Sequence, residues 1–117
     1  MENVRDILND FTSGLGEMGK EEGAVVDAFM GLQTATFQPT ALDTKTKELI
    51  SVGIGVYNRC KYCIVFHVYS AYQAGATRQE ILDAAMTVVG GFGGGPSMAY
   101  SSTYLLAAVN EFEHDFD

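Results

Sequence analysis

The stretch NRCKYCIVFHVYSAYQAGATRQE, residues 58–80, contains the clearest helix boundaries in the chain. The asparagine–arginine pair at 58–59 predicts a turn. A helix is predicted from about Cys60 until Gly75, because glycine readily adopts the left-handed conformation that ends many helices. The residues T-R-Q-E at 77–80 match a capping box, in which threonine and glutamate side chains satisfy backbone N–H groups at a helix start. This stretch therefore predicts two successive helices joined by a short connection.

Apolar residues at helical spacing predict three helices before this stretch. The first carries Val4, Ile7, Leu8, Phe11 and Leu15, and the second carries Val25, Ala28, Phe29 and Leu32. We expect Gly14 and Gly16 to weaken the end of the first helix, because glycine disfavours helix interiors. The second helix is predicted to end near Pro39. Asp43 or Thr44 can cap the third helix.

The glycine-rich run at 90–96 is predicted to break the fifth helix. Pro96 suits the first turn of a sixth helix, where its missing N–H costs nothing. Apolar residues repeat along this last helix at Leu105, Leu106, Val109 and Phe112. Strand-like alternation is not sustained anywhere, so the sequence predicts an all-α bundle of about six helices, in a single domain over residues 1–117.

Composition restricts the classes of partner. The chain has 7 Lys and Arg against 15 Asp and Glu, a formal net charge of −8, which disfavours binding to nucleic acid and to anionic membrane surfaces. The first residues, MENVRDILND, lack the basic start and apolar run of a secretory signal, and no apolar stretch approaches the roughly 18 residues that span a bilayer. We therefore expect a cytoplasmic protein.

Both cysteines of the chain lie close to a histidine in sequence. Cys60 and Cys63 are three residues apart, and His67 follows Cys63 by four, so all three project from one helix face. A disulfide between such near neighbours closes a tiny loop and constrains the unfolded chain little. The positive end of the helix dipole also favours thiolate over thiol at a helix start. The pair is therefore interpreted as redox-active or metal-binding.

A length argument adds Glu48 to this site. Glu48 lies nine residues before Tyr57, about 14 Å back along a helix at a rise of ~1.5 Å per residue. His67 lies eight residues after Arg59, about 12 Å along the next helix. If the two helices fold back on each other near Asn58, the carboxylate and the imidazole come level. The carboxylate can then fix the tautomer of the imidazole, which can exchange protons with the sulfur chemistry.

The pattern E-x(11)-C-x-x-C-x-x-x-H, present as Glu48, Cys60, Cys63 and His67, resembles the alkylhydroperoxidase D (AhpD)-like branch of the carboxymuconolactone decarboxylase family. The resemblance extends over residues 44–112. It implies an all-helical fold, homotrimers or homohexamers, and reduction of peroxides or disulfides. It also implies that Cys63 attacks, that Cys60 resolves, and that Glu48 and His67 relay protons. One departure is Tyr62, where the best-studied peroxidases of the family have histidine.

Helix electrostatics alone favour Cys60 as the more reactive sulfur, because Cys60 is nearer the helix N-terminus. We follow the resemblance in assigning the attack to Cys63. The resulting hypothesis is a thiolate that attacks a peroxide or disulfide, followed by formation of a Cys60–Cys63 disulfide.

No cofactor is predicted. Neither a strand–G-x-G-x-x-G–helix unit nor a phosphate loop is present, so we expect no bound flavin or nicotinamide. The electron donor is then an external thiol or dithiol, either small or carried by a redox protein. The high apolar content and the 13 glycines of this short chain favour a homo-oligomer that buries the remaining apolar faces.

Two alternatives remain open from the sequence. The first is a zinc-binding structural module, in which Cys60, Cys63, His67 and Glu48 supply four ligands. The second is the decarboxylase side of the same family, against which the intact cysteine pair argues.

Overall fold

The computed structural model describes all 117 residues and contains no β-strand, which confirms the all-α prediction. The α-helices are α1 (Val4–Glu21), α2 (Gly23–Thr36), α3 (Thr44–Asn58), α4 (Lys61–Gln73), α5 (Arg78–Val88), α6 (Gly94–Tyr100) and α7 (Leu106–Phe112). Two π-helical segments, η1 (Val89–Gly93) and η2 (Ser101–Leu105), lie between the last three. The count differs slightly from the predicted six or so, because η2 divides the last predicted helix into α6 and α7.

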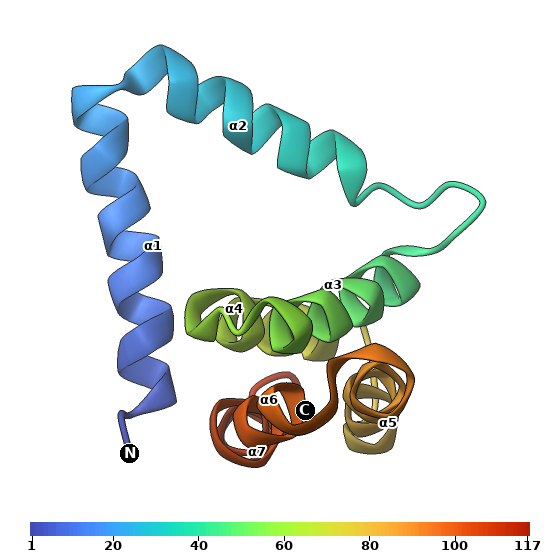
Figure 1. Ribbon diagram of the computed structural model, residues 1–117. Coiled ribbons are helices and arrows are strands. Elements are labelled where there is room, and N and C mark those ends of the chain that lie inside the picture. Colours follow the sequence, from blue (N-terminus) through green and yellow to red (C-terminus); the bar gives the residue numbers. More distant parts are fainter.

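Helix α4, part of the body formed by α3 to α7, lies beside α3 and also packs against α1, α7 and η2 (Figure 1). Its residues Ile64, Val65 and Val68 are fully buried. The core contains Val4, Ile7, Leu8, Val52, Val56, Ile64, Val65, Val68, Ala71, Tyr72, Ala76, Ile81, Ala85, Leu105, Ala108, Val109 and Phe112. Burial of such side chains contributes about 1.5–3 kcal/mol each and fixes α4 against its neighbours. The helix that begins at the cysteine pair is therefore held firmly.

Helices α3 and α4 form the predicted hairpin. Gly55 makes their close approach possible, because a Cβ atom there would lie only 3.3 Å from the backbone nitrogen of Ile64. Arg59 ends α3 in the left-handed conformation, and its N–H and that of Cys60 both bind the Gly55 carbonyl. The hairpin thus brings the middle of α3 level with the middle of α4.

The predicted caps are present. The Thr77 hydroxyl accepts a hydrogen bond from the Glu80 N–H, and the Glu80 carboxylate accepts one from the Thr77 N–H, which completes the capping box. The backbone bond from Thr77, together with Lys45, holds the pKa of Glu80 below its usual value. Asp43 caps α3 through the Thr46 N–H, and Gly75 has a φ of 92° beyond α4. These boundaries were predictable because each depends on residues within four positions.

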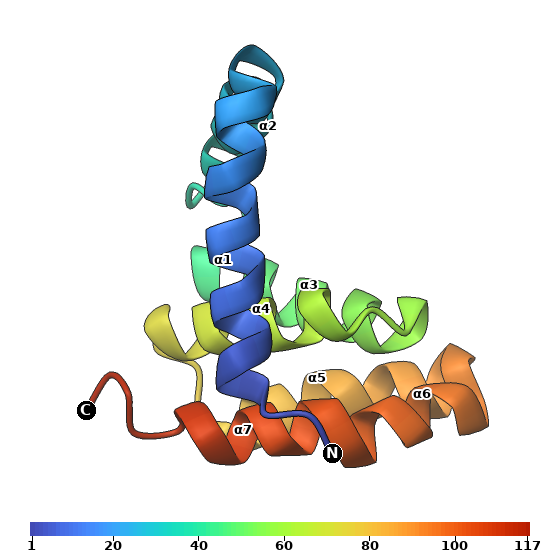
Figure 2. The ribbon, with the colours of Figure 1, turned by 90° about the vertical axis from the view of Figure 1, so that its left-hand side faces the viewer.

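The glycine-rich run was predicted to break the fifth helix, but its first residues extend α5 before the chain turns. Residues 89–93 continue α5 as a π-helical turn, and the chain then reverses at Gly94, whose φ is 59°. Figure 2 shows α6 and α7 running back along the body. Pro96 lies in the first turn of α6, as predicted.

The first helix does not end near Gly14 and Gly16, where the glycines were expected to weaken its end, since α1 continues to Glu21. Glycine keeps both backbone hydrogen-bonding groups, and its cost of about 1 kcal/mol does not break a helix anchored elsewhere. The anchor is the first two turns, where Val4, Ile7 and Leu8 are buried.

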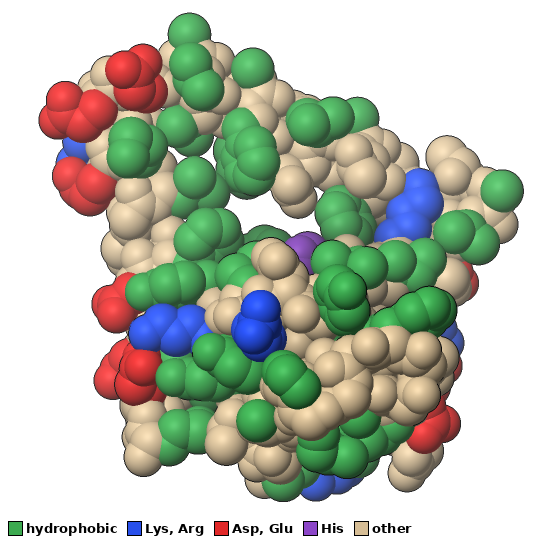
Figure 3. All heavy atoms as spheres, viewed as in Figure 1, with side chains coloured by type: hydrophobic (Ala, Val, Ile, Leu, Met, Phe, Trp, Pro, Cys, Tyr) green, Lys and Arg blue, Asp and Glu red, His purple; other side chains and the backbone are tan.

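Residues 9–36, here called the arm, extend away from the body (Figures 1 and 2). Helix α2 has no buried residue, although most of its side chains are apolar. Figure 3 shows an opening between the arm and the body, with hydrophobic side chains and a histidine around it. No helix combines the length and apolar character needed to cross a membrane.

Candidate active site

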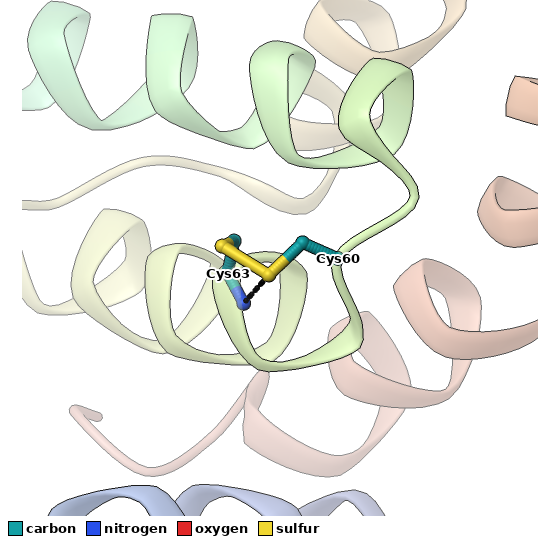
Figure 4. Close-up of a disulfide and its surroundings, with 2 residues drawn as sticks. All are labelled: Cys60 and Cys63. Carbon is teal, nitrogen blue, oxygen red and sulfur yellow. Dashed lines mark hydrogen bonds between the residues drawn. A yellow bond between two sulfur atoms is a disulfide. The ribbon is translucent and has the colours of Figure 1, made fainter.

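The two cysteines form a disulfide at the start of α4, with 5.2 Å between their Cα atoms (Figure 4). Cys60 is the N-cap residue and has extended backbone angles. Its Sγ accepts a hydrogen bond from the Cys63 N–H at 3.2 Å. Backbone N–H groups in the first turn have no partners within the helix, so they stabilise negative charge placed at this end. Cys60 therefore lies where a thiolate is favoured.

The predicted pairing of Glu48 with His67 is confirmed: Oε2 of Glu48 lies 2.7 Å from Nδ1 of His67. The Glu48 side chain is only 8% exposed and the His67 side chain 18%. A carboxylate at Nδ1 fixes the orientation of the ring and directs the chemistry to the other nitrogen. Nε2 of His67 has no hydrogen-bond partner in the chain, so it is free for a substrate or a sulfur atom.

Two aromatic rings hold the imidazole in place. Phe37, which follows α2, stacks on it with ring centroids 5.7 Å apart, and Phe66 meets it edge-on at 5.3 Å. These contacts were not predicted, because Phe37 lies thirty positions before His67 and shares no pattern with it. Only the return of the chain from the arm brings the two together.

Cys63 and His67 line two pockets, whereas Cys60 lines neither of them. The larger pocket, of about 400 Å³, lies beneath the arm and is mainly apolar. Its other lining residues are Phe11, Thr12, Leu15, Phe29, Met30, Gln33 and Phe66. The smaller, of about 180 Å³, is completed by Ser51, Ile54, Gly55 and Asn58. Of the two cysteines, Cys63 is therefore the one that shares these pockets with His67.

The sequence did not reveal that the arm contributes to the site. Phe11, Leu15 and Phe29 were assigned only to apolar helix stripes, which ordinarily pack into a core. In the structure they face the pocket instead. Tyr62 is partly exposed and packs near Phe11, with ring centroids 6.5 Å apart.

The zinc alternative gains no support from this arrangement. No group of three or more His, Cys, Asp or Glu side chains is placed to hold a metal ion. The two sulfurs are bonded to each other, and the Glu48 carboxylate is bound to His67. His114 is exposed near the C-terminal end and pairs with Asp117.

Comparison with known proteins identifies the family. A model described as the carboxymuconolactone decarboxylase family matches residues 23–107. The crystal structure of apo-lpg0406 from Legionella pneumophila, a protein of that family, is 35% identical with a TM-score of 0.89, over 97% of this chain and 99% of that one.

Two further relatives differ in coverage. Uncharacterised protein 4 in the cox locus of Paracoccus denitrificans is 37% identical over 73 residues, which is 62% of this chain and 66% of that protein. Alkyl hydroperoxide reductase AhpD of Mycobacterium marinum is 28% identical over 109 residues, 92% of this chain and 57% of its own length. The chain thus spans little more than half of AhpD.

Fold and site together define an all-helical protein with a Cys-x-x-Cys disulfide beside a buried Glu–His pair. The chain belongs to the carboxymuconolactone decarboxylase family, and its similarities support the AhpD-like branch, as the sequence resemblance predicted.

Proposed function

We propose that this chain is a thiol–disulfide oxidoreductase that reduces peroxides, disulfides or both through Cys60 and Cys63. The observation that carries the proposal is a helix-capping disulfide whose accessible sulfur shares two pockets with an imidazole bound to a buried carboxylate. The relationship to a protein named alkyl hydroperoxide reductase supports it. The intact cysteine pair favours this activity over that of a decarboxylase.

The first step is attack by the Cys63 thiolate, because Cys63 lines both pockets. With a hydroperoxide, the O–O bond breaks, Cys63 becomes a sulfenic acid, and the leaving alkoxide takes a proton from His67. With a disulfide, the S–S bond breaks, Cys63 forms a mixed disulfide, and a thiolate leaves. The apolar lining beneath the arm suits the organic part of either substrate.

The second step is attack by Cys60 on the Cys63 sulfur. A Cys60 thiolate is stabilised by the N–H groups at the start of α4, including that of Cys63. The attack displaces water from the sulfenic acid, or the second thiolate from a mixed disulfide, and forms the Cys60–Cys63 disulfide. Glu48 keeps His67 oriented so that it can give up and recover protons in both steps.

Two electrons must then return from outside the chain. An external thiol, a dithiol or a redox protein reduces the disulfide, with no bound flavin or nicotinamide. A cytoplasmic location would supply such reductants.

A redox titration of metal-free wild-type protein tests the proposal. We expect Cys60 and Cys63 to interconvert reversibly between dithiol and disulfide at a potential within the range of cellular thiol–disulfide couples. Trapping of free thiols with an alkylating reagent, followed by intact mass, measures the reduced fraction at each potential. A pair that stays reduced under mild oxidants would contradict the proposal, and release of tightly bound zinc would favour the structural zinc module.

We further propose a homo-oligomer, a trimer or hexamer, in which a second copy covers the apolar side chains of α2. Within one chain, Val25 and Leu32 are 65% and 62% exposed, and Asp27 is the only charged residue of the helix. A helix this apolar is ordinarily buried. Closed symmetric assembly is the usual way to bury such a face.

Light scattering at micromolar concentration measures the mass directly. We expect three or six times the 12.6 kDa of one chain, and a shift towards the monomer for Leu32→Asp, which introduces a charge into the apolar face. A monomeric wild-type protein would refute the assembly.

A further inference from the structure

Arg59 differs from the other cationic side chains in having no partner. Five of the seven Lys and Arg residues pair with carboxylates: Arg5, Lys20, Lys45, Lys61 and Arg78. Lys47 donates to the backbone carbonyls of Thr36 and Gln38. Arg59 makes neither a hydrogen bond nor an ion pair with its side chain, although acidic residues outnumber basic ones by about two to one.

The backbone does not account for an arginine at this position either. Arg59 has a φ of 54° and is the one residue other than glycine with a positive φ. This conformation costs an L-residue about 1–2 kcal/mol, whereas glycine adopts it freely. A strained residue that has no local partner is a candidate for a binding role.

The pocket beside Arg59 offers further free donors. It measures about 310 Å³ and is lined by Arg59, Asn58, Ser97 and the rings of Tyr57 and Phe92, with no carboxylate. Ser97 is only 1% exposed, and its hydroxyl makes no hydrogen bond within the chain. The side chain of Asn58 is also free. A guanidinium, a hydroxyl and an amide around one pocket suit a small anion, and a carboxylate matches the planar guanidinium best.

This pocket shares one lining residue with the smaller pocket at Cys63. Asn58 lines it and also lines the smaller pocket that contains Cys63 and His67. Lys61, the other cation next to Cys60, is held by Glu2, which raises the pKa of its amine and leaves Arg59 as the available positive charge. A molecule with its carboxylate at Arg59 can therefore extend past Asn58 towards Cys63.

We propose that the pocket at Arg59 binds the carboxylate of a small thiol that reduces the Cys60–Cys63 disulfide. This inference rests on the proposed oxidoreductase function and specifies the donor. The donor thiolate attacks Sγ of Cys63, a mixed disulfide forms, and Cys60 leaves as a thiolate stabilised by the start of α4. A second donor thiolate attacks the donor sulfur of the mixed disulfide, which releases the Cys63 thiolate and an oxidised donor disulfide. The two electrons pass from two thiols to the cysteine pair.

The test compares two small thiols of similar size, 3-mercaptopropionate and 2-mercaptoethanol, as reductants of the oxidised full-length protein. Rates are followed anaerobically by alkylation and intact mass, and are expressed per concentration of thiolate. For Arg59→Gly we expect the rate with 3-mercaptopropionate to fall about tenfold, because the loss of one charge-assisted hydrogen bond has an effect of about that size. The rate with 2-mercaptoethanol should change less than twofold.

Three variants separate binding from folding and from net charge. Arg59→Gly suits the positive φ, so thermal unfolding should show no loss of stability. Arg59→Lys keeps the charge and should retain most of the preference for the anionic thiol. Lys20→Gln removes an equal charge from the exposed end of α1 and should leave both rates unchanged.

If Arg59→Gly lowers the rates with both thiols equally, or lowers neither rate, the pocket at Arg59 does not bind the donor carboxylate. The proposed redox function would be unaffected by that result. Failure of the oxidised wild-type pair to react with any thiol would overturn both proposals.

Discussion

Replacement of Cys63 by serine is expected to abolish turnover and to prevent the first covalent step with either a peroxide or a disulfide. Cys63 is the cysteine that lines the two pockets, and a serine hydroxyl is not a comparable nucleophile near neutral pH. The expected loss is more than a thousandfold, because the one cysteine that remains, Cys60, lines neither pocket. Single-turnover reactions followed by intact mass measure adduct formation separately from turnover.

Cys60→Ser is the matched control. It should still form the Cys63 sulfenic acid or mixed disulfide, but it should stop there, because the resolving sulfur is missing. The adduct should therefore accumulate to about one per chain. An adduct that forms on Cys60 in the Cys63→Ser protein would reverse the two roles. Cys60 would then be the attacking cysteine, which is the assignment that the helix dipole alone favours. Full turnover in both variants would exclude the mechanism.

Loss of the His67 imidazole is expected to slow the first covalent step by about 10²–10⁴-fold, the usual contribution of a positioned acid–base group. In His67→Asn the leaving alkoxide or thiolate has no nearby acid. Stopped-flow or quenched single turnovers measure the effect.

Two other substitutions make the result specific. Glu48→Gln keeps a side chain of the same size but removes the buried charge, so its effect should be smaller than that of His67→Asn. His114→Asn changes the same residue type at an exposed position near the C-terminal end and should have no effect. A rate for His67→Asn within threefold of wild type would remove His67 from the mechanism.

The site was predictable where its geometry is local. The spacing of Cys60, Cys63 and His67 places them on successive turns of one helix, whatever the rest of the chain does. Glu48 was also predictable, because one tight turn joins two helices of known rise, and length alone then sets which residues meet. The 2.7 Å contact between Glu48 and His67 follows from that hairpin.

The arm was not predictable. Its apolar stripes are typical of helices that pack into a core, and sequence periodicity does not say whether the covering surface belongs to the same chain. In the structure the apolar side chains of α2 lie outside the core, and Phe29 and Met30 line the larger pocket at Cys63. The role of Phe37 against His67 likewise depends on where the arm returns to the body.

The sequence by itself therefore determined the helical class, most helix boundaries, the cysteine pair and its alignment with Glu48 and His67, because caps, glycine stops and residue spacing act over a few residues. Only the tertiary structure decided that Cys63 rather than Cys60 faces the pockets, and that Arg59 alone among the cations has no partner. Pockets and ion pairs form between segments far apart in the chain. Their positions follow from how the helices pack, which no local pattern specifies.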